Sequence, residues 1–216
     1  MADNRHKYGF RFYSSLTGVG RTAAVEFPVA TSYPPVINTN VSVGLSIGDP
    51  VQILTDGSVA LAGDTTTTGA VPFGVIVGLR GKVDANQKSR PASFLPTTLA
   101  YSTKENETRV QVLPFGRDLW EIDADDASTA TTEAAYRALI GNNFDMVYLL
   151  DASNPDKRRA NPMLDISGGG FGANTAHFRL FGISGTRENA DFSGNFVKLL
   201  VQLNEGREPM FTATGL

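Results

Sequence analysis

The sequence predicts a mainly β protein, with a small β-barrel or sandwich core, one short helix and an extended N-terminal arm. Its 216 residues include 22 glycines, 11 prolines and 13 phenylalanines, a composition typical of strands joined by many turns. Short apolar runs alternate with turn sequences between residues 41 and 79, and alternating apolar and polar residues recur later in the chain. The length suits one domain, which we divide into an arm over residues 1–40 and a β-rich core over residues 41–216.

The predicted arm interleaves aromatic and basic side chains and then becomes rich in proline. A short strand is possible around residues 10–14, but the segment lacks a dense hydrophobic period, so we predict an extended conformation. Its aromatic side chains either fold back on their own core or anchor the chain to a neighbouring subunit, and both alternatives stay open. The candidate contacts to a partner are Phe10, Arg11, Phe12, Tyr13, Phe27 and Tyr33.

Residues 41–79 predict three or four short strands joined by tight turns. Asp56 and Gly57 are predicted to form a two-residue hairpin turn, because both residue types tolerate a positive φ. A long loop is expected over about residues 80–108. The alternating segments 109–113 and 119–123 then predict two half-buried strands with these side chains facing inward: Val110, Val112, Trp120 and Ile122.

The one predicted helix runs from about Thr131 to Ile140 and is stopped by Gly141. Strands are expected at residues 145–150, 177–183 and 196–203, with a second long loop over about residues 151–175. In the last strand, four apolar side chains predict one covered face, while Lys198, Leu200 and Gln202 lie on the other. The four apolar residues are Val197, Leu199, Val201 and Leu203.

Charge and composition exclude several classes of function. The formal net charge is −3 and no basic face is evident, so direct binding of nucleic acid is not expected. Cysteine is absent, which excludes disulfides, thiolate nucleophiles and zinc–thiolate sites. The polar N-terminus and the lack of a long apolar run predict no signal core and no membrane span, so synthesis in a cytoplasm-like compartment is expected.

Residues 44–48 match the Gly-x-Ser-x-Gly nucleophile elbow, with Ser46 in the serine position. The elbow requires a strand that turns into a helix and a base near the serine. Here Asp49-Pro50 and a second strand pattern follow, and the only downstream histidine is His177. A glycine-bracketed turn is therefore the favoured interpretation, and a serine hydrolase using Ser46 is a minor alternative.

Three further patterns invite a cofactor or metal and fit simpler explanations better. Residues 168–173 resemble a dinucleotide loop but precede a strand pattern, where the mechanism needs a helix N-terminus. The acidic residues Asp123, Asp125 and Asp126 lack the rest of a calcium loop and suit a solvated strand end. His177 fits a polar strand face better than a base or ligand. We therefore predict no catalytic residue, no cofactor and no metal site.

The order of these features resembles the structural cement, or head decoration, proteins of tailed bacteriophages. The resemblance spans roughly residues 41–205. It begins with residues 43–51 and their Gly48-Asp49 turn, the Asp56-Gly57 hairpin that leads into residues 59–62, and the apolar run 73–79. It continues through segments 109–113, 139–141, 145–147, 164–167, 177–183 and 195–205.

This resemblance implies a non-enzymatic β-rich protein that binds the outside of an assembled phage capsid and bridges neighbouring capsomers. The implied partners are the major capsid protein and further copies of the chain, as a dimer or trimer. The implied location is the outer surface of the virion, after synthesis in the host cytoplasm. Another virion component, such as a tail or baseplate protein, is the main alternative.

Overall fold

The computed structural model describes residues 9–16, 23–30, 36–37, 41–62, 71–81, 90–92, 94–95, 108–125, 130–149, 160–167, 176–186, 189, 192 and 196–204. These residues form a mainly β fold with two antiparallel sheets and one short helix, as the sequence predicts. Within them neither sheet closes on itself, so the arrangement is that of a sandwich and not of a closed barrel.

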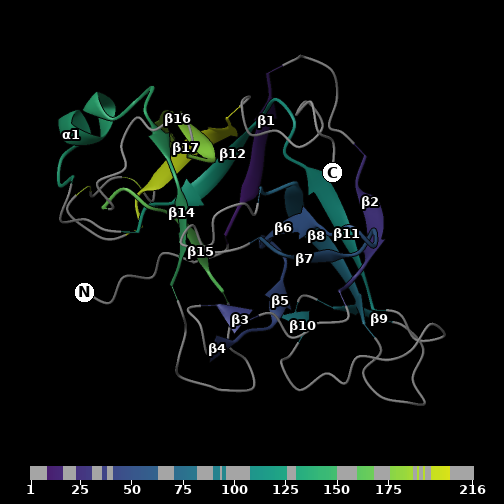
Figure 1. Cartoon of the computed structure of the whole chain (residues 1–216). Coiled ribbons are helices and arrows are strands. Elements are labelled where there is room, and N and C mark those ends of the chain that lie inside the picture. Colours follow the sequence, from purple (N-terminus) through teal and green to yellow (C-terminus); the bar gives the residue numbers. More distant parts are fainter. Residues whose placement is uncertain are drawn as a thin grey trace.

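The first sheet has five strands, and its order mixes distant parts of the chain. From one edge to the other the strands are β1 (Arg11–Ser15), β12 (Asp118–Asp123), β17 (Lys198–Leu203), β16 (Phe178–Ile183) and β13 (Asn143–Phe144). Strands β12 and β17 therefore occupy the middle of this sheet. Helix α1 (Glu133–Ala138) lies at the outer end of the same half of the molecule (Figure 1).

The second sheet has six strands and is built around β8 (Gly74–Gly81). Its order is β2 (Val25–Pro28), β11 (Arg109–Pro114), β8, β6 (Pro50–Ile53) and β7 (Val59–Leu61), and β9 (Arg90–Ala92) also pairs with β8. Gly74 is required where β8 meets β11, because a Cβ there would lie 2.5 Å from the carbonyl oxygen of Leu113.

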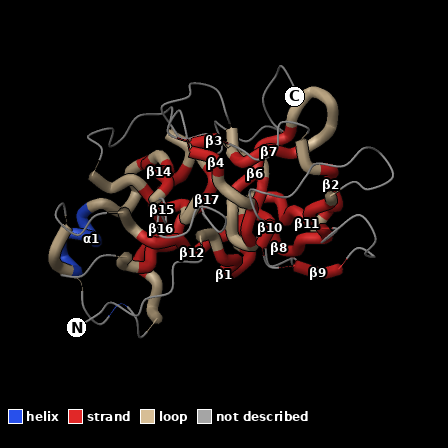
Figure 2. The backbone as a smooth tube through the Cα atoms, turned by 90° about the horizontal axis from the view of Figure 1, so that it is seen from below, coloured by secondary structure: helices blue, strands red, loops and turns tan. Residues whose placement is uncertain are grey.

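Three short strand pairs complete the described fold. They are β3 (Val36–Ile37) with β4 (Val41–Ser42), β5 (Leu45–Ser46) with β10 (Phe94–Leu95), and β14 (Met146–Tyr148) with β15 (Pro162–Leu164). Figures 1 and 2 place the first sheet and α1 on one side of the molecule and the second sheet on the other.

Both sheets contribute to one hydrophobic core with an aromatic centre. Phe115 lies on the short connection that carries the chain from β11 in the second sheet to β12 in the first. Its ring centroid is 5.0–5.1 Å from those of Phe10, Trp120 and Phe178. Edge-on contacts of this kind each contribute about 0.5–1.5 kcal/mol beyond burial. The indole of Trp120 also donates a hydrogen bond to the Phe115 carbonyl (3.2 Å), which fixes the connection.

Several predicted elements are confirmed with small shifts. Val110, Val112, Trp120 and Ile122 are all buried. The helix is shorter than predicted: Thr132 caps it, accepting a hydrogen bond from the Ala135 amide (3.2 Å), and Gly141 follows it at a φ of +94°. The predicted long loops contain the short strands β9, β10 and β15, which pair with β8, β5 and β14 respectively.

The hairpin between β6 and β7 differs from the predicted two-residue turn. The Gly57 amide donates to the Leu54 carbonyl (2.9 Å) and the Leu54 amide to the Ser58 carbonyl (2.8 Å), which encloses three residues. Gly57 has a φ of +78°, while Asp56 does not adopt a positive φ. Asp56 instead accepts hydrogen bonds from the backbone amide (2.9 Å) and hydroxyl (2.6 Å) of Ser58. The connection is therefore a three-residue hairpin loop in which glycine adopts the left-handed backbone conformation.

The prediction that the last strand is covered on one face is wrong. In β17, Lys198 and Leu200 are buried as well as the inward apolar residues. Strand β12 is likewise buried along its whole length. Both strands lie in the middle of the first sheet, and the connection from β16 to β17 supplies polar groups that cover their second face. The place of each strand in the sheet therefore determines its burial.

Candidate functional site

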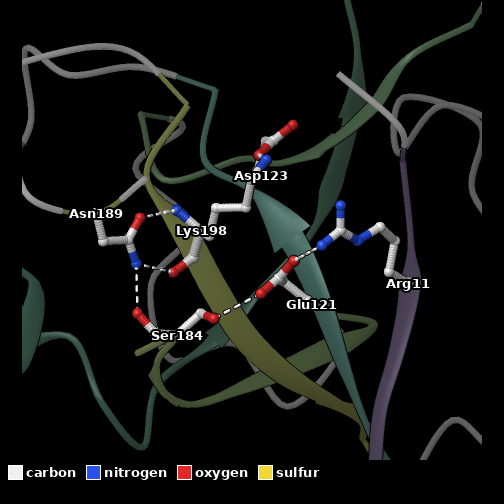
Figure 3. Close-up of polar contacts among 6 residues, drawn as sticks. All are labelled: Arg11, Glu121, Asp123, Ser184, Asn189 and Lys198. Carbon is white, nitrogen blue, oxygen red and sulfur yellow. Dashed lines mark hydrogen bonds and ion pairs between the residues drawn. The ribbon is translucent and has the colours of Figure 1, made fainter. Parts of the chain in front are cut away.

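A buried ion pair lies across the two central strands of the first sheet. Asp123 on β12 is directly opposite Lys198 on β17, and the Lys198 ammonium group contacts a carboxylate oxygen of Asp123. Both side chains are almost fully buried. Figure 3 shows the pair beside other polar groups that lie on the same two strands and their neighbours. An ion pair in this setting exists only because each charge compensates the other.

Glu121 forms the second polar contact of this face. Its side chain is buried, and one carboxylate oxygen accepts a hydrogen bond from the Ser184 hydroxyl (2.5 Å). The other oxygen lies 3.0 Å from the guanidinium of Arg11, which is directly opposite Glu121 on the edge strand β1. The buried carboxylate is thus tied to β1 on one side and to the end of β16 on the other (Figure 3).

Asn189 fixes the connection between β16 and β17. Its amide nitrogen donates to the carbonyl oxygens of Ser184 (2.7 Å) and Lys198 (2.8 Å), and its amide oxygen accepts from the Lys198 backbone amide (2.8 Å). One buried side chain therefore satisfies three backbone groups at the base of the connection. The backbone bond from the Ser184 amide to the Lys198 carbonyl (3.0 Å) closes the same base.

We define these six residues as the polar network: Arg11, Glu121, Asp123, Ser184, Asn189 and Lys198. Each charge in it has a partner of opposite sign, and each buried amide or hydroxyl group named above is hydrogen-bonded. Its chemistry is that of a positioning network that holds four strand ends together. Sequence patterns do not reveal this network, because alternation in β17 places Lys198 on a face expected to be uncovered.

Ser46 is the last residue of β5 and is followed by a turn, so it does not lie in a nucleophile elbow. Its backbone amide donates to the Asp49 carboxylate (2.7 Å), and the Asp49 amide donates back to the Ser46 carbonyl (3.2 Å). Gly48 has a φ of +97°, and strand β6 begins at Pro50. The Ser46 hydroxyl is buried and has no hydrogen-bond partner among the described residues. The helix and the serine–base contact that the elbow needs are therefore missing from this part of the structure.

The acidic residues considered for calcium are separated by the fold. Asp123 belongs to the ion pair, whereas Asp125 accepts hydrogen bonds from the Ile166 amide (2.9 Å) and the Ser167 hydroxyl (2.8 Å). Burial raises the pKa of Asp125, and those two hydrogen bonds oppose the shift. Asp126 lies outside the described residues. Within the described residues, no group of three acidic or histidine side chains is placed to hold a metal ion.

His177 pairs with Asp145 at the start of β16. Its ring nitrogen Nδ1 lies 2.9 Å from an Asp145 carboxylate oxygen, which also accepts the His177 backbone amide (3.2 Å). The His177 carbonyl accepts a hydrogen bond from the Asn204 amide (2.8 Å), so His177 joins the start of β16 to the end of β17. The predicted polar position holds, although the side chain is more buried than a solvated strand face implies.

The aromatic residues of the predicted arm are divided between the two sheets. Phe10 is buried against Phe115, Phe12 packs edge-on against Trp120 (5.8 Å) and Phe27 packs against Phe73 (5.7 Å). Of the two alternatives for the aromatic side chains of the arm, these three therefore fold back on the chain's own core. Residues 11–15 and 25–28 are strands of the first and second sheet, so residue 40 does not separate an arm from a core there.

Arg11 and Tyr13 project from the exposed side of β1. Arg11 forms the ion pair with Glu121, and Tyr13 sits at a register shift between Phe12 and Ser14 with 48% of its surface exposed. Tyr33, the glycine-rich segment 168–173 and His6 lie outside the described residues. Among the six candidate contacts, Tyr13 is the described aromatic residue that remains open to a partner.

Comparisons with known proteins do not place the chain in a family. Neither the family models, nor the curated proteins, nor the solved structures yielded a match. In the part of the chain that the structure describes, no helix has the length and apolar character needed to cross a membrane.

Proposed function

We propose that this chain is a non-enzymatic structural protein of a phage virion, which binds the outer surface of the assembled capsid and bridges neighbouring capsomers. The observation that carries the proposal is the order of features that resembles head decoration proteins. Those features fall on strands β5 to β8, β11 and β14 to β17 and at the end of helix α1. The features that carry the resemblance therefore include strands of both sheets and the turns on either side of β6.

The use of polar residues supports the same proposal. Ser46, Asp123 and His177 are three of the residues that sequence patterns offered for chemistry; the Ser46 hydroxyl is enclosed within the fold, and the other two side chains pair with neighbours. The charged groups of the polar network compensate one another and join β1, β12, β16 and β17. Such an arrangement favours mechanical integrity of the sheet, as a protein that clamps a shell requires.

The test is binding to shells that lack this protein. Purified intact chain and purified shells are co-sedimented, and the thermal release of DNA from filled particles is measured with and without the bound chain. We expect saturable binding at many copies per particle and release at a higher temperature. Failure of the intact chain to sediment with shells would overturn the proposal, and a few copies per particle would favour a tail or baseplate component.

Deletion of residues 1–33 does not test the binding contact, because it disrupts the fold. It removes β1 and β2, and with β1 the Arg11 partner of Glu121 and the core residue Phe10. A deleted chain that failed to bind would report loss of folding. Substitutions of exposed side chains test the contact directly, because they leave both sheets intact.

A further inference from the structure

A shallow apolar groove lies on the first sheet beside the end of helix α1. It has a volume of about 440 Å³, and it is lined by Ile140, Gly141, Arg179, Leu180, Phe181 and Gln202. Two of these residues are large apolar side chains that are unusually open to solvent: Phe181 is 50% exposed and Ile140 is 41% exposed. Exposed apolar side chains gathered around a hollow mark a surface for contact with another molecule.

The strand geometry explains why Phe181 points outward. The register of β16 against β17 shifts between Leu180 and Gly182, which leaves Phe181 as the extra residue of a bulge. Bulges re-aim side chains locally. The flanking backbone is fixed, because Leu180 donates to the Asn142 carbonyl (2.9 Å) and accepts from the Gly141 amide (2.9 Å). The groove is therefore held in place before any partner binds.

Charge indicates what the groove accepts. Arg179 is the only charged residue among those that line it, and no ion pair engages Arg179 within the described residues. A second hollow, of about 430 Å³, contains Glu133 and Arg137, which neutralise each other at 2.5 Å. Among the described residues, the first groove thus offers one positive charge without a counter-charge beside two apolar side chains, and it favours an acidic group next to a bulky apolar residue.

We propose that this groove is the contact for the shell protein, and that it binds a segment in which an aspartate or glutamate stands within two residues of a large apolar side chain. This inference rests on the proposed function and names the chemistry of its partner. The apolar side chain packs against Phe181 and Ile140, while the carboxylate pairs with the Arg179 guanidinium.

Three variants test the groove in the co-sedimentation experiment. Phe181→Ser removes the apolar anchor, Arg179→Glu reverses the charge, and Leu149→Ser is the matched control because Leu149 is 40% exposed but does not line the groove. We expect each groove variant to bind shells at least about tenfold more weakly, a loss typical of a contact that dominates an interface. The control should bind like the intact chain, and all three should unfold at the same denaturant concentration as the intact chain.

The outcomes separate this inference from the proposed function. If the intact chain does not bind shells, the proposed function fails. If the intact chain binds and both groove variants bind equally well, the proposed function stands and the groove inference is overturned. Weak binding by Leu149→Ser to the same extent would also overturn it, since the loss would then not be specific to the groove.

A photo-crosslinker at position 181 tests the partner's chemistry. Phe181→benzoylphenylalanine is bound to shells and irradiated, and the crosslinked peptide is identified by mass spectrometry. We expect a shell-protein peptide with an acidic residue within two positions of a bulky apolar residue. A crosslink to a basic peptide, or to another copy of this chain, would overturn the assignment.

Discussion

Asp123 and Lys198 lie directly opposite each other on β12 and β17, and their charged groups pair inside the protein. Because neither charge is solvated, the contribution of each side chain to the free energy of unfolding depends on the presence of the other. This dependence gives the polar network a measurable signature.

Removing one member of the pair should destabilise the protein far more than removing both. We expect Asp123→Leu or Lys198→Met alone to lower the free energy of unfolding by about 3–5 kcal/mol, since each leaves a buried charge without a partner. The double variant should lose clearly less than the sum of the two. Urea denaturation of all four proteins measures this coupling, and strictly additive losses would show that the two charges do not compensate each other.

Asn189 should be sensitive to both truncation and charge. Asn189→Ala removes three hydrogen bonds to buried backbone groups, so we expect a loss of about 2–4 kcal/mol in the free energy of unfolding. Asn189→Asp cannot donate to the two carbonyls when ionised, and it should be at least as damaging at neutral pH. Its loss should shrink in acid, where the carboxyl group is protonated. Denaturation at both pH values decides this, and equal losses at the two would contradict it.

Asp125 should make stability depend on pH in a defined direction. Burial raises its pKa in the folded protein above the ordinary 3.8, so the folded state holds a proton that the unfolded state releases. The Asp125 contribution to the free energy of unfolding therefore falls as pH rises from about 3.8 through the raised pKa. Asp125→Asn lacks this ionisation and should gain stability relative to the native chain as pH rises to neutral. A difference between the two proteins that is constant from acid to neutral pH would contradict the assignment.

Gly57 should be required for its backbone conformation and not for space. Its φ is +78°, and a Cβ added there would meet no atom within 4 Å. We expect Gly57→Ala to cost about 1–2 kcal/mol and Gly57→Asn to cost less, because asparagine tolerates the left-handed region better. Gly185→Ala is the control, since that position has neither a positive φ nor a nearby atom. Thermal denaturation ranks the three variants, and equal melting temperatures for the two Gly57 variants would argue against a conformational cause.

Substitution of two aromatic residues near the start of the chain should change the free energy of unfolding by very different amounts. Phe10 lies in the core and Tyr13 projects from β1, so Phe10→Ala should cost about 3–5 kcal/mol and Tyr13→Ser less than about 0.5 kcal/mol. Chemical denaturation provides the measurement. A large loss for Tyr13→Ser would mean that its side chain is part of the fold and is not available to a partner.

Much of the local structure followed from short-range patterns. Alternation located the inward residues of β11 and β12, and capping and glycine chemistry located α1. The apolar groove was harder to predict from the sequence. Arg179 and Phe181 share a face by simple alternation, so that face was visible in the sequence, but the bulge and the neighbouring Ile140 were not. Register shifts depend on the partner strand, which a sequence pattern does not contain.

Residue patterns alone were enough to establish the class of the protein: a mainly β chain without cysteine, with turns at glycine and a single short helix. They did not reveal that β1 and β2 belong to the two sheets, or that Lys198 is buried opposite Asp123, because both facts depend on the folded chain. Turn chemistry and alternation act over a few residues. The burial of a strand's second face depends instead on which distant segments become its neighbours.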